Sequence, residues 1–203
     1  MVSVAADGAA SGRRFEVLAE AGRLFSERGY HATTMRDIAK ACNVQPASLY
    51  AHFPSKESLL VELVHRYFDV VTTAMRSVAD DAATGALQLA RLMEALVGAG
   101  MANRTEFMVV ANDWNHVLQT PALSGLLSRR DEVLDLLRGA LERAIDDRSL
   151  RADLEVEAVL WVLTSLVAGM VDERFEHRLV DDASPPVRTM LSVVFDGLAP
   201  NRA

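Results

Sequence analysis

Residues 34–53, Thr-Met-Arg-Asp-Ile-Ala-Lys-Ala-Cys-Asn-Val-Gln-Pro-Ala-Ser-Leu-Tyr-Ala-His-Phe, predict two short helices joined by a tight turn. Thr34 can cap the first helix, because its hydroxyl reaches the backbone of Asp37 while the Asp37 carboxylate can return to the cap. Asn43 tolerates the left-handed backbone conformation that turns the chain after that helix. Pro46 has no backbone N–H to leave unpaired and therefore suits the first turn of the second helix.

The outer face of this second helix carries groups that can contact DNA. Leu49 and Phe53 lie four residues apart and would face the first helix, which leaves small, hydroxyl and amide side chains outside. Hydroxyls and amides bond to phosphate oxygens and base edges, and small residues allow close approach. Lys56 follows a second helix cap at Ser55 and would add a cation at the phosphate backbone. The predicted DNA-binding residues are Arg14, Thr34, Gln45, Pro46, Ala47, Ser48, Tyr50, His52 and Lys56.

Arg14 belongs to a pair of arginines, Arg13 and Arg14, at the expected start of the preceding helix. Their charges oppose the helix dipole, so the placement does not favour stability. Contact with phosphates or with the minor groove would explain it. A solvated pair of arginines is the alternative interpretation.

Residues 14–60 resemble the DNA-binding domain of the TetR family of one-component transcriptional regulators. The matching residues are Ala21-x-x-Leu24-Phe25-x-x-x-Gly29-Tyr30-x-x-Thr33-Thr34, Asp37-Ile38-Ala39, Val44 and Ser48-Leu49-Tyr50-x-His52-Phe53-x-Ser55-Lys56-Glu57-x-Leu59. The resemblance implies an all-α fold, with an N-terminal three-helix DNA-binding domain that contains a helix-turn-helix and a C-terminal helical domain for ligand binding and dimerisation. It also implies a sequence-specific transcriptional regulator, most commonly a repressor that a ligand releases from its operator.

The chain departs from the family pattern at three positions. The family usually has Gly where Asn43 stands and often Gly where Ala47 stands, and an aromatic residue or His is common at the position of Ala51. Ala51 removes a possible contact to DNA, so the operator sequence cannot be transferred from a relative.

The composition agrees with a helical DNA-binding protein. The 203 residues are 50% apolar and 6% aromatic, with only 6 Pro, which is typical of a helical chain with a sizeable core. The net charge of -7 is unevenly placed: residues 1–60 contribute +1 and the remainder contributes -8. An acidic protein can still bind a duplex where its basic groups cluster on one face.

The chain is expected to divide into a flexible tail at 1–12, the DNA-binding domain at 13–60 with its motif at 34–53, and a ligand-binding and dimerisation domain at 61–203. Apolar residues recur at intervals of three and four residues along the rest of the chain, as in amphipathic helices. Helices are predicted outside the motif at 13–28, 56–81, 84–103, 105–118, 121–148, 153–178 and 186–198.

The middle helices carry the candidate lining of a ligand pocket. Methionines suit an adaptable pocket because the thioether chain repacks around different shapes. Ordinary helix-bundle core is the alternative for each of these residues. The predicted ligand-binding residues are Met93, Val97, Met101, Phe107, Val110, Ala111, Trp114 and Arg130.

A polar stretch, Asn112 to His116, interrupts the apolar pattern of these helices. An ion pair between Asp113 and Arg129 or Arg130 would satisfy a buried charge, and this is the simpler interpretation. Asp113-Trp114, followed by Arg130-Asp131-Glu132, is also similar to TetR-family members that sense acyl-coenzyme A thioesters in lipid or sterol breakdown. That similarity implies arginines that bind coenzyme phosphates and a Met-rich cavity for the acyl chain.

The last two helices have broad apolar faces, and the family resemblance implies that they form a four-helix interface in a homodimer. A dimer also suits the motif, because a two-fold pair reads a palindrome with half-sites about one helical turn apart. The predicted interface residues are Leu160, Leu163, Val167, Met190 and Val194.

Other protein classes find little support in the sequence. Five His and one Cys offer no metal spacing, nucleophile elbow or glycine-rich phosphate loop, so neither an enzyme nor a bound cofactor or metal is expected. Cys42 alone cannot form an internal disulfide, and the longest run without a charged residue or His, Ala158 to Val171, is 14 residues, which is short of the ~20 that cross a bilayer. A cytoplasmic protein without a membrane partner is expected. A helical adaptor or ligand-binding protein that has lost DNA binding remains the rival hypothesis.

Overall fold

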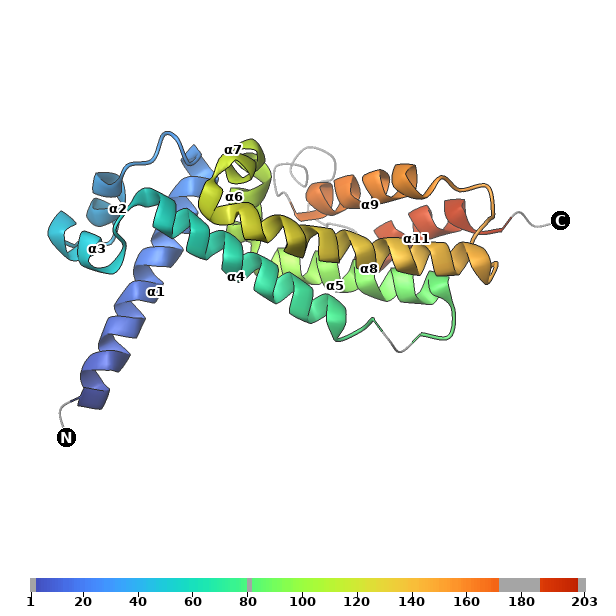
Figure 1. Cartoon of the computed structure of the whole chain (residues 1–203), viewed down its shortest axis with the longest axis horizontal. Helices are drawn as coiled ribbons and strands as arrows, with labels where there is room; N and C mark the ends of the chain where they lie inside the picture. The colour runs from blue at the N-terminus through green and yellow to red at the C-terminus, as the bar shows by residue number, and fades with distance from the viewer. Residues whose placement is uncertain (1–2, 80–81, 172–186, 201–203) are drawn as a thin grey trace. The chain divides into compact units, whose positions relative to one another are not determined.

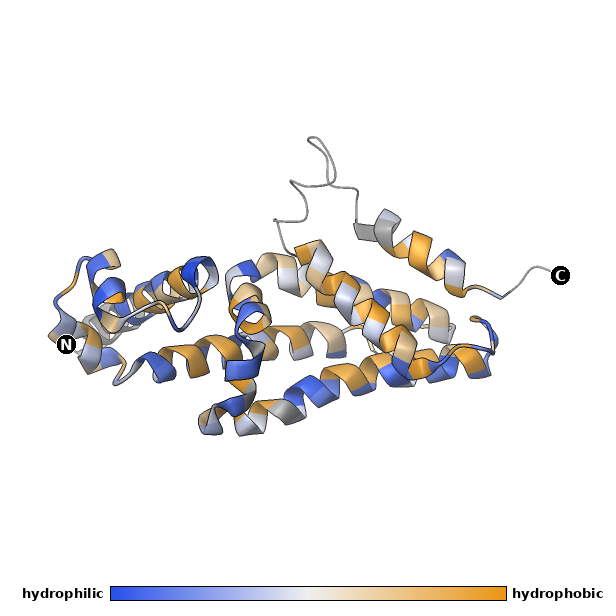
Figure 2. Ribbon diagram, turned by 90° about the horizontal axis from the view of Figure 1, so that it is seen from above, coloured by the Kyte–Doolittle hydropathy of each residue, from blue (hydrophilic) through white to orange (hydrophobic). Residues whose placement is uncertain are grey.

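A computed structural model describes residues 3–79, 82–171 and 187–200. Within these ranges the chain forms helices and no strand, as the sequence predicted (Figure 1). Figure 2 shows hydrophobic and hydrophilic residues alternating along the helices, the pattern of amphipathic helices that bury one side. None of these helices is both long and apolar enough to cross a membrane.

The chain divides into two compact units, and each is described by itself. The first unit is Met1–Tyr67 with Thr105–Ser124, and the second is Phe68–Arg104 with Gly125–Ala203. The expected domain boundary at residue 60 therefore differs from this division, because residues from the middle of the chain group with the N-terminal helices.

The first unit is built from α1 (Ser3–Arg28), α2 (Met35–Ala41), α3 (Pro46–His52), the beginning of α4 (Lys56–Arg76), α6 (Arg104–Asn112) and α7 (Trp114–Gln119). Its core is apolar and almost fully buried, and its largest side chains are Leu18, Leu24, Phe25, Ile38, Leu49, Phe53, Leu59, Leu60 and Leu63. Helix α6 comes close to α1 at Gly22, where an added Cβ would lie 3.0 Å from the Thr105 methyl group. Gly29 ends α1 with a φ of 86°, as expected for a helix C-terminus.

Helix α1 begins at Ser3 rather than at the predicted Arg13, so the expected flexible tail is drawn as helix. Four alanines lie between Ser3 and Gly12, and alanine has the highest helix propensity. This composition favours a helix that begins before Arg13. The side chains of residues 3–11 lie outside the described part.

The second unit is organised around α5 (Gly85–Ala102), which packs against α8 (Leu127–Asp146), α9 (Val156–Val171) and α11 (Val187–Leu198) (Figure 1). Helix α5 buries one broad face, which includes Leu89, Leu92, Met93 and Val97. The segment predicted as one helix at 121–148 begins as the 3-10 turn η1 (Pro121–Leu126). The predicted helix at 56–81 ends earlier, at Arg76, and residues 77–79 form a turn. Residues 80–81 and the predicted continuation of α9 to residue 178 lie outside the described residues.

Candidate nucleic-acid interface

The helix-turn-helix begins with a closed cap at Thr34. The Thr34 hydroxyl accepts a hydrogen bond from Asp37 N at 3.2 Å, and the Asp37 carboxylate accepts one from Thr34 N at 2.9 Å. This reciprocal capping box confirms the predicted start of α2. The Thr34 hydroxyl and backbone N–H both stabilise the carboxylate and lower the pKa of Asp37.

The turn between the two helices rests on Asn43, which has a φ of 53°. Val44 N donates to Ala39 O at 2.9 Å and Asn43 N donates to Lys40 O at 3.1 Å, the two hydrogen bonds of a Schellman motif. Asn43 therefore holds the left-handed position that the sequence predicted. Burial raises the pKa of the Cys42 thiol, in agreement with a packing role for that residue.

Helix α3 presents its predicted outer face to solvent. Leu49 and Phe53 are both 0% exposed and hold the helix in the core of the first unit. Tyr50 is 51% exposed, while His52 is half-buried. The other exposed residues of this face are Gln45, Pro46, Ala47, Ser48 and Ala51. The helix thus offers a hydroxyl, an amide and an aromatic ring beside residues small enough for close approach to a groove.

Arg14 has internal partners in this unit. Its guanidinium donates to the backbone oxygen of His52 at 2.6 Å, pairs with Glu62, and lies 4.1 Å from the centre of the Phe53 ring. Arg14 therefore ties α1 to the end of α3 and to α4, a role that the sequence did not predict. The neighbouring Arg13 pairs with Glu16 at 2.9 Å.

Lys56 is likewise turned inward. Its ammonium donates to the backbone oxygens of Tyr30 at 2.7 Å and Thr33 at 2.8 Å, and lies 4.1 Å from the centre of the Tyr30 ring. Burial lowers the pKa of Lys56, and the charge of Asp113 opposes that effect. The ammonium that was predicted to contact a DNA phosphate thus bonds to backbone oxygens of the first unit.

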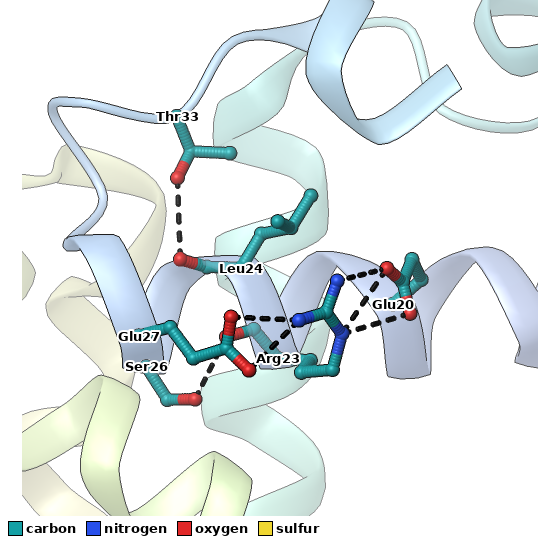
Figure 3. A network of polar contacts seen from close by, with 6 residues as sticks. All are labelled: Glu20, Arg23, Leu24, Ser26, Glu27 and Thr33. Carbon is teal, nitrogen blue, oxygen red and sulfur yellow. Dashed lines mark hydrogen bonds and ion pairs between the residues drawn. The ribbon is translucent and has the colours of Figure 1, made fainter. Parts of the chain in front are cut away.

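The last turns of α1 anchor the loop that leads into α2 (Figure 3). Arg23 pairs with Glu20 at 2.5 Å and with Glu27 at 2.6 Å, and these acceptors raise its pKa. Thr33, buried at 1% exposure, donates its hydroxyl to Leu24 O at 3.3 Å. The Thr33 hydroxyl therefore fixes the loop from residue 29 to 34 to the end of α1, whereas the ion pairs of Arg23 lie within that helix.

Asp113 has a different partner from the predicted one. Its carboxylate accepts a hydrogen bond from Tyr30 N at 2.9 Å, while Arg129 pairs with Asp69 and Arg130 with Asp131. The predicted helix at 105–118 is broken at Asp113, which separates α6 from α7 and frees the side chain from a helix face. The ring of His116 stacks on that of Tyr30 with 4.4 Å between ring centres. This cluster was missed, because the sequence marks Tyr30 only as part of the family pattern.

The predicted ligand-binding residues fall in both units. Met93 and Val97 are 0% exposed in α5 of the second unit, which also holds Arg130, whereas Phe107 and Val110 are buried in α6 of the first. Met101 is 44% exposed and Ala111 is exposed, so neither side chain is buried in the core of its unit. The side chain of Trp114 lies outside the described part.

The predicted dimer-interface residues of α9 belong instead to the core of the second unit. Leu160, Leu163 and Val167 are at most 4% exposed. Trp161 is 72% exposed and lies on the other side of the same helix. On α11, Val194 is half-buried, and the side chain of Met190 lies outside the described residues. A continuous apolar run does not mark which side of a helix faces the core, so the sequence could not assign burial along α9.

Comparisons with known proteins agree with this architecture. Residues 17–63 match the family model described as bacterial regulatory proteins, tetR family. The transcriptional repressor KstR2 of Rhodococcus jostii is 32% identical over 191 residues, which cover 93% of this chain and 92% of that protein. The structure of the ketosteroid transcriptional regulator KstR2 of Mycobacterium tuberculosis has a TM-score of 0.82 at 26% identity and covers 92% of this chain and 95% of the other.

A more distant structure shares the fold. AibR, whose structure contains isovaleryl coenzyme A and operator DNA, has a TM-score of 0.74 at 20% identity and covers 92% of this chain and 97% of its own. At this identity the likeness concerns the fold alone. The extent and identity of the match to the repressor from Rhodococcus jostii go further, and together with the family model they show that the chain belongs to the TetR family of bacterial regulatory proteins.

Proposed function

We propose that the protein is a sequence-specific transcriptional repressor that reads DNA with α3. The observation that carries this proposal is the exposed face of α3, which follows the closed turn at Asn43 and is held on a buried base of Leu49 and Phe53. A helix of this kind can enter the major groove and bring three or four side chains to base edges. Relatives that cover most of the chain are transcriptional repressors.

The direct contacts belong to the outer face of α3 and to the cap of α2. Tyr50, Ser48 and Gln45 supply the polar groups, and Ala47 and Pro46 leave room for the backbone to approach. Thr34 and His52 flank this face as further candidates. Arg14 and Lys56 bond to backbone oxygens within the first unit, so we assign them to holding the helix-turn-helix in place and not to direct DNA contacts.

A homodimer would place two copies of α3 on the halves of a palindrome. The exposed apolar residues Trp161 and Val162 on α9 and Val193 on α11 supply the surface for it. Exposed apolar side chains of this size favour association when they cluster. We propose these residues for the interface in place of Leu160, Leu163 and Val167, because those three side chains are buried in the core of the second unit.

The effector is proposed to be a small apolar molecule or an acyl-coenzyme A thioester that releases the repressor from its operator. Support comes from the similarity of Asp113-Trp114 and Arg130-Asp131-Glu132 to acyl-coenzyme A sensors, and from the shared fold of AibR, which accommodates both isovaleryl coenzyme A and DNA. The ligand would act by population shift, because it binds better to the conformation that binds DNA less well.

Selection of bound duplexes from a random-sequence library tests the proposal. We expect the purified protein to enrich a palindrome with half-sites about one helical turn apart. Gel shifts with that duplex, run with and without acyl-coenzyme A thioesters at fixed salt, then test release. No enrichment, even in dilute buffer, would favour the rival adaptor or ligand-binding protein. Enrichment without release by any thioester would refute the effector class and leave the DNA-binding function standing.

A further inference from the structure

The second unit carries a groove beside the surface proposed for the dimer. The groove lies between α9 and α11, which both pack on α5, and has a volume of about 230 Å³. Its lining is mostly apolar and includes Leu154, Val159, Val162, Val194 and Leu198. The backbone N–H of Arg151 donates to Leu198 O at 3.1 Å, which ties the segment before α9 to the end of α11. The groove is therefore built by one chain.

Trp161 stands next to this groove but points away from it. Successive residues of an α-helix leave the axis about 100° apart, so the Trp161 side chain lies on a different side of α9 from Val162 and Val159. It is 72% exposed. Ala158 and Ser165, which precede and follow Trp161 on the same face, are small and exposed, so another chain can approach the ring closely. The indole is thus accessible to a partner and does not fill its own groove.

The groove suits an indole in size and in polar groups. A cavity of about 150 Å³ holds benzene, so a groove of about 230 Å³ has room for the two fused rings of tryptophan. A buried indole keeps its N–H paired, and the carboxylates of Asp153 and Glu155 at the groove can accept it. Arg151, whose Nε lies 3.3 Å from the Asp153 carboxylate, supplies a cation that can contact the ring face.

A two-fold axis satisfies the ring and the groove at once. In an isologous pair each copy offers the surface that it receives, so Trp161 of each copy can meet the groove of the other. Two indoles that bury about 150–250 Å² each are a sizeable share of the ~1,200–2,000 Å² of a stable interface. Val162 and Val193, which are 49% and 71% exposed, extend the apolar surface around these contacts. A second copy of the chain is therefore the occupant that matches both features.

We propose that the indole of Trp161 inserts into the groove of a second copy of this chain, and that this reciprocal contact anchors the homodimer. Asp153 or Glu155 accepts the indole N–H, and the guanidinium of Arg151 lies against the ring. This inference rests on the homodimer of the proposed function and adds the contact that holds it together.

Sedimentation velocity over a range of protein concentrations measures the dissociation constant of the dimer. We expect Trp161→Ala to raise that constant by at least about 30-fold, the loss typical of truncating a buried interface tryptophan. Val159→Phe fills the groove from within and should weaken the dimer as strongly, although Trp161 remains. Phe15→Ala, which removes a 56% exposed ring from the first unit, is the matched control and should leave the constant unchanged. A dimer that is as tight in Trp161→Ala as in wild type would overturn the proposal.

Mixing the two variants tests whether the ring and the groove meet. Trp161→Ala keeps the groove and Val159→Phe keeps the ring, so one of the two contacts returns only in a mixed dimer. We expect the mixture to associate at least about fivefold more tightly than either variant alone, since one contact contributes half of the free energy of two independent ones. No gain on mixing, with both variants unfolding at the wild-type temperature, would show that the ring packs elsewhere.

Fluorescence follows the same contact without a change to the groove. In Trp114→Phe, Trp161 is the only tryptophan, so the emission reports on its surroundings alone. We expect the emission to shift to shorter wavelength as the protein dimerises, because the indole moves from water into an apolar groove. Unchanged emission in a protein that dimerises would overturn the inference and leave the homodimer standing. A protein that stays monomeric at every concentration would instead refute the proposed homodimer.

A small apolar molecule is the other candidate occupant of the groove. The dye 1-anilinonaphthalene-8-sulfonate binds exposed apolar surface, so we expect Trp161→Ala to bind more of it than the wild-type dimer, whose grooves are filled. Dye that is bound by the wild-type dimer and lost in Val159→Phe would assign the groove to a ligand and overturn the proposal.

Discussion

Gly85 lies directly against the backbone of Ala144: a Cβ built on Gly85 would come within 2.2 Å of the Ala144 nitrogen. Helices α5 and α8 therefore meet backbone to backbone at this point. The contact is reinforced where Gly85 N donates to the Asp147 carboxylate at 2.7 Å and Ala86 N donates to the Ser149 hydroxyl at 3.0 Å. These bonds satisfy amides at the N-terminus of α5 that the helix itself leaves unpaired.

Gly85→Ala should therefore destabilise the protein by about 1–3 kcal/mol, because no flexible side chain can move aside to admit the methyl group. Gly98→Ala in the same helix is the matched control. An added Cβ at Gly98 meets nothing within 4 Å, so the higher helix propensity of alanine should stabilise the protein by about 0.5–1 kcal/mol. Urea unfolding of both variants measures the difference. A stable Gly85→Ala protein would mean that α5 and α8 can separate without cost.

Local sequence signals predicted the helix-turn-helix because its geometry depends on neighbours in the chain. Thr34 and Asp37 are three residues apart and satisfy each other, and the turn at Asn43 is closed by hydrogen bonds within five residues. The burial of Leu49 and Phe53 follows from their helical spacing. None of these features needs knowledge of distant segments.

Asn43 provides a direct test of that local reasoning. Since its φ of 53° is accessible to glycine without steric cost, Asn43→Gly should leave stability unchanged or raise it slightly. Asn43→Ala should destabilise the protein by about 1 kcal/mol, because alanine tolerates the left-handed region less well than asparagine. Thermal unfolding of the two variants at equal concentration checks the order. Equal stability of the alanine and glycine variants would contradict the assigned turn geometry.

The sequence could not predict features that depend on residues distant along the chain. Asp113 and Tyr30 are 83 positions apart, and no local pattern favours this pair over an arginine of the following helix. Lys56 was predicted to contact a phosphate because it follows the DNA-reading helix closely in the sequence. Its ammonium bonds to backbone oxygens of a loop that lies 23 to 26 residues earlier, and no local pattern indicates that contact. In α9, both sides of the helix are apolar, so burial could not be assigned by composition alone.

Trp161→Glu should give a monomer with a nearly unchanged melting temperature, because Trp161 is 72% exposed and the charge would oppose association without entering the core. Leu163→Glu should instead unfold the protein, since Leu163 is 0% exposed and an unpaired buried charge costs several kcal/mol. Sedimentation velocity and thermal unfolding distinguish the two results. Val70→Glu on α4, which is 39% exposed, controls for a charge placed on another exposed apolar position. A dimer that survives Trp161→Glu would exclude this face of α9.

Tyr50→Ala should weaken operator binding by about 10- to 100-fold, the range expected for loss of a groove contact, and should not change unfolding. The side chain is 51% exposed, so little packing is lost. Tyr50→Phe separates the hydroxyl from the ring. Leu49→Ala on the buried side of the same helix should show the opposite pattern, with about 2–5 kcal/mol of lost stability. Gel shifts at fixed salt that find Tyr50→Ala equal to wild type would remove Tyr50 from the interface.

Asp37 makes the stability of the helix-turn-helix depend on pH. Its carboxylate is stabilised by the Thr34 hydroxyl and backbone N–H, so the pKa in the folded protein is lower than the usual 3.8. A carboxyl whose pKa is lowered by folding stabilises the protein while it is ionised. This contribution is complete above the unfolded pKa and is lost as the pH falls through the folded one.

Asp37→Ala should accordingly lower the melting temperature by a constant amount above about pH 5, and the difference from wild type should shrink below pH 3.8. The pKa of Asp147 is also lowered, chiefly by Ser149, but that pair is present in both proteins and cancels in the comparison. Thr34→Ala tests the cause, because it removes the hydroxyl partner and should reduce the same pH dependence. A difference in melting temperature that stays constant down to pH 2.5 would show that the capping box contributes through shape alone, without the charge of Asp37.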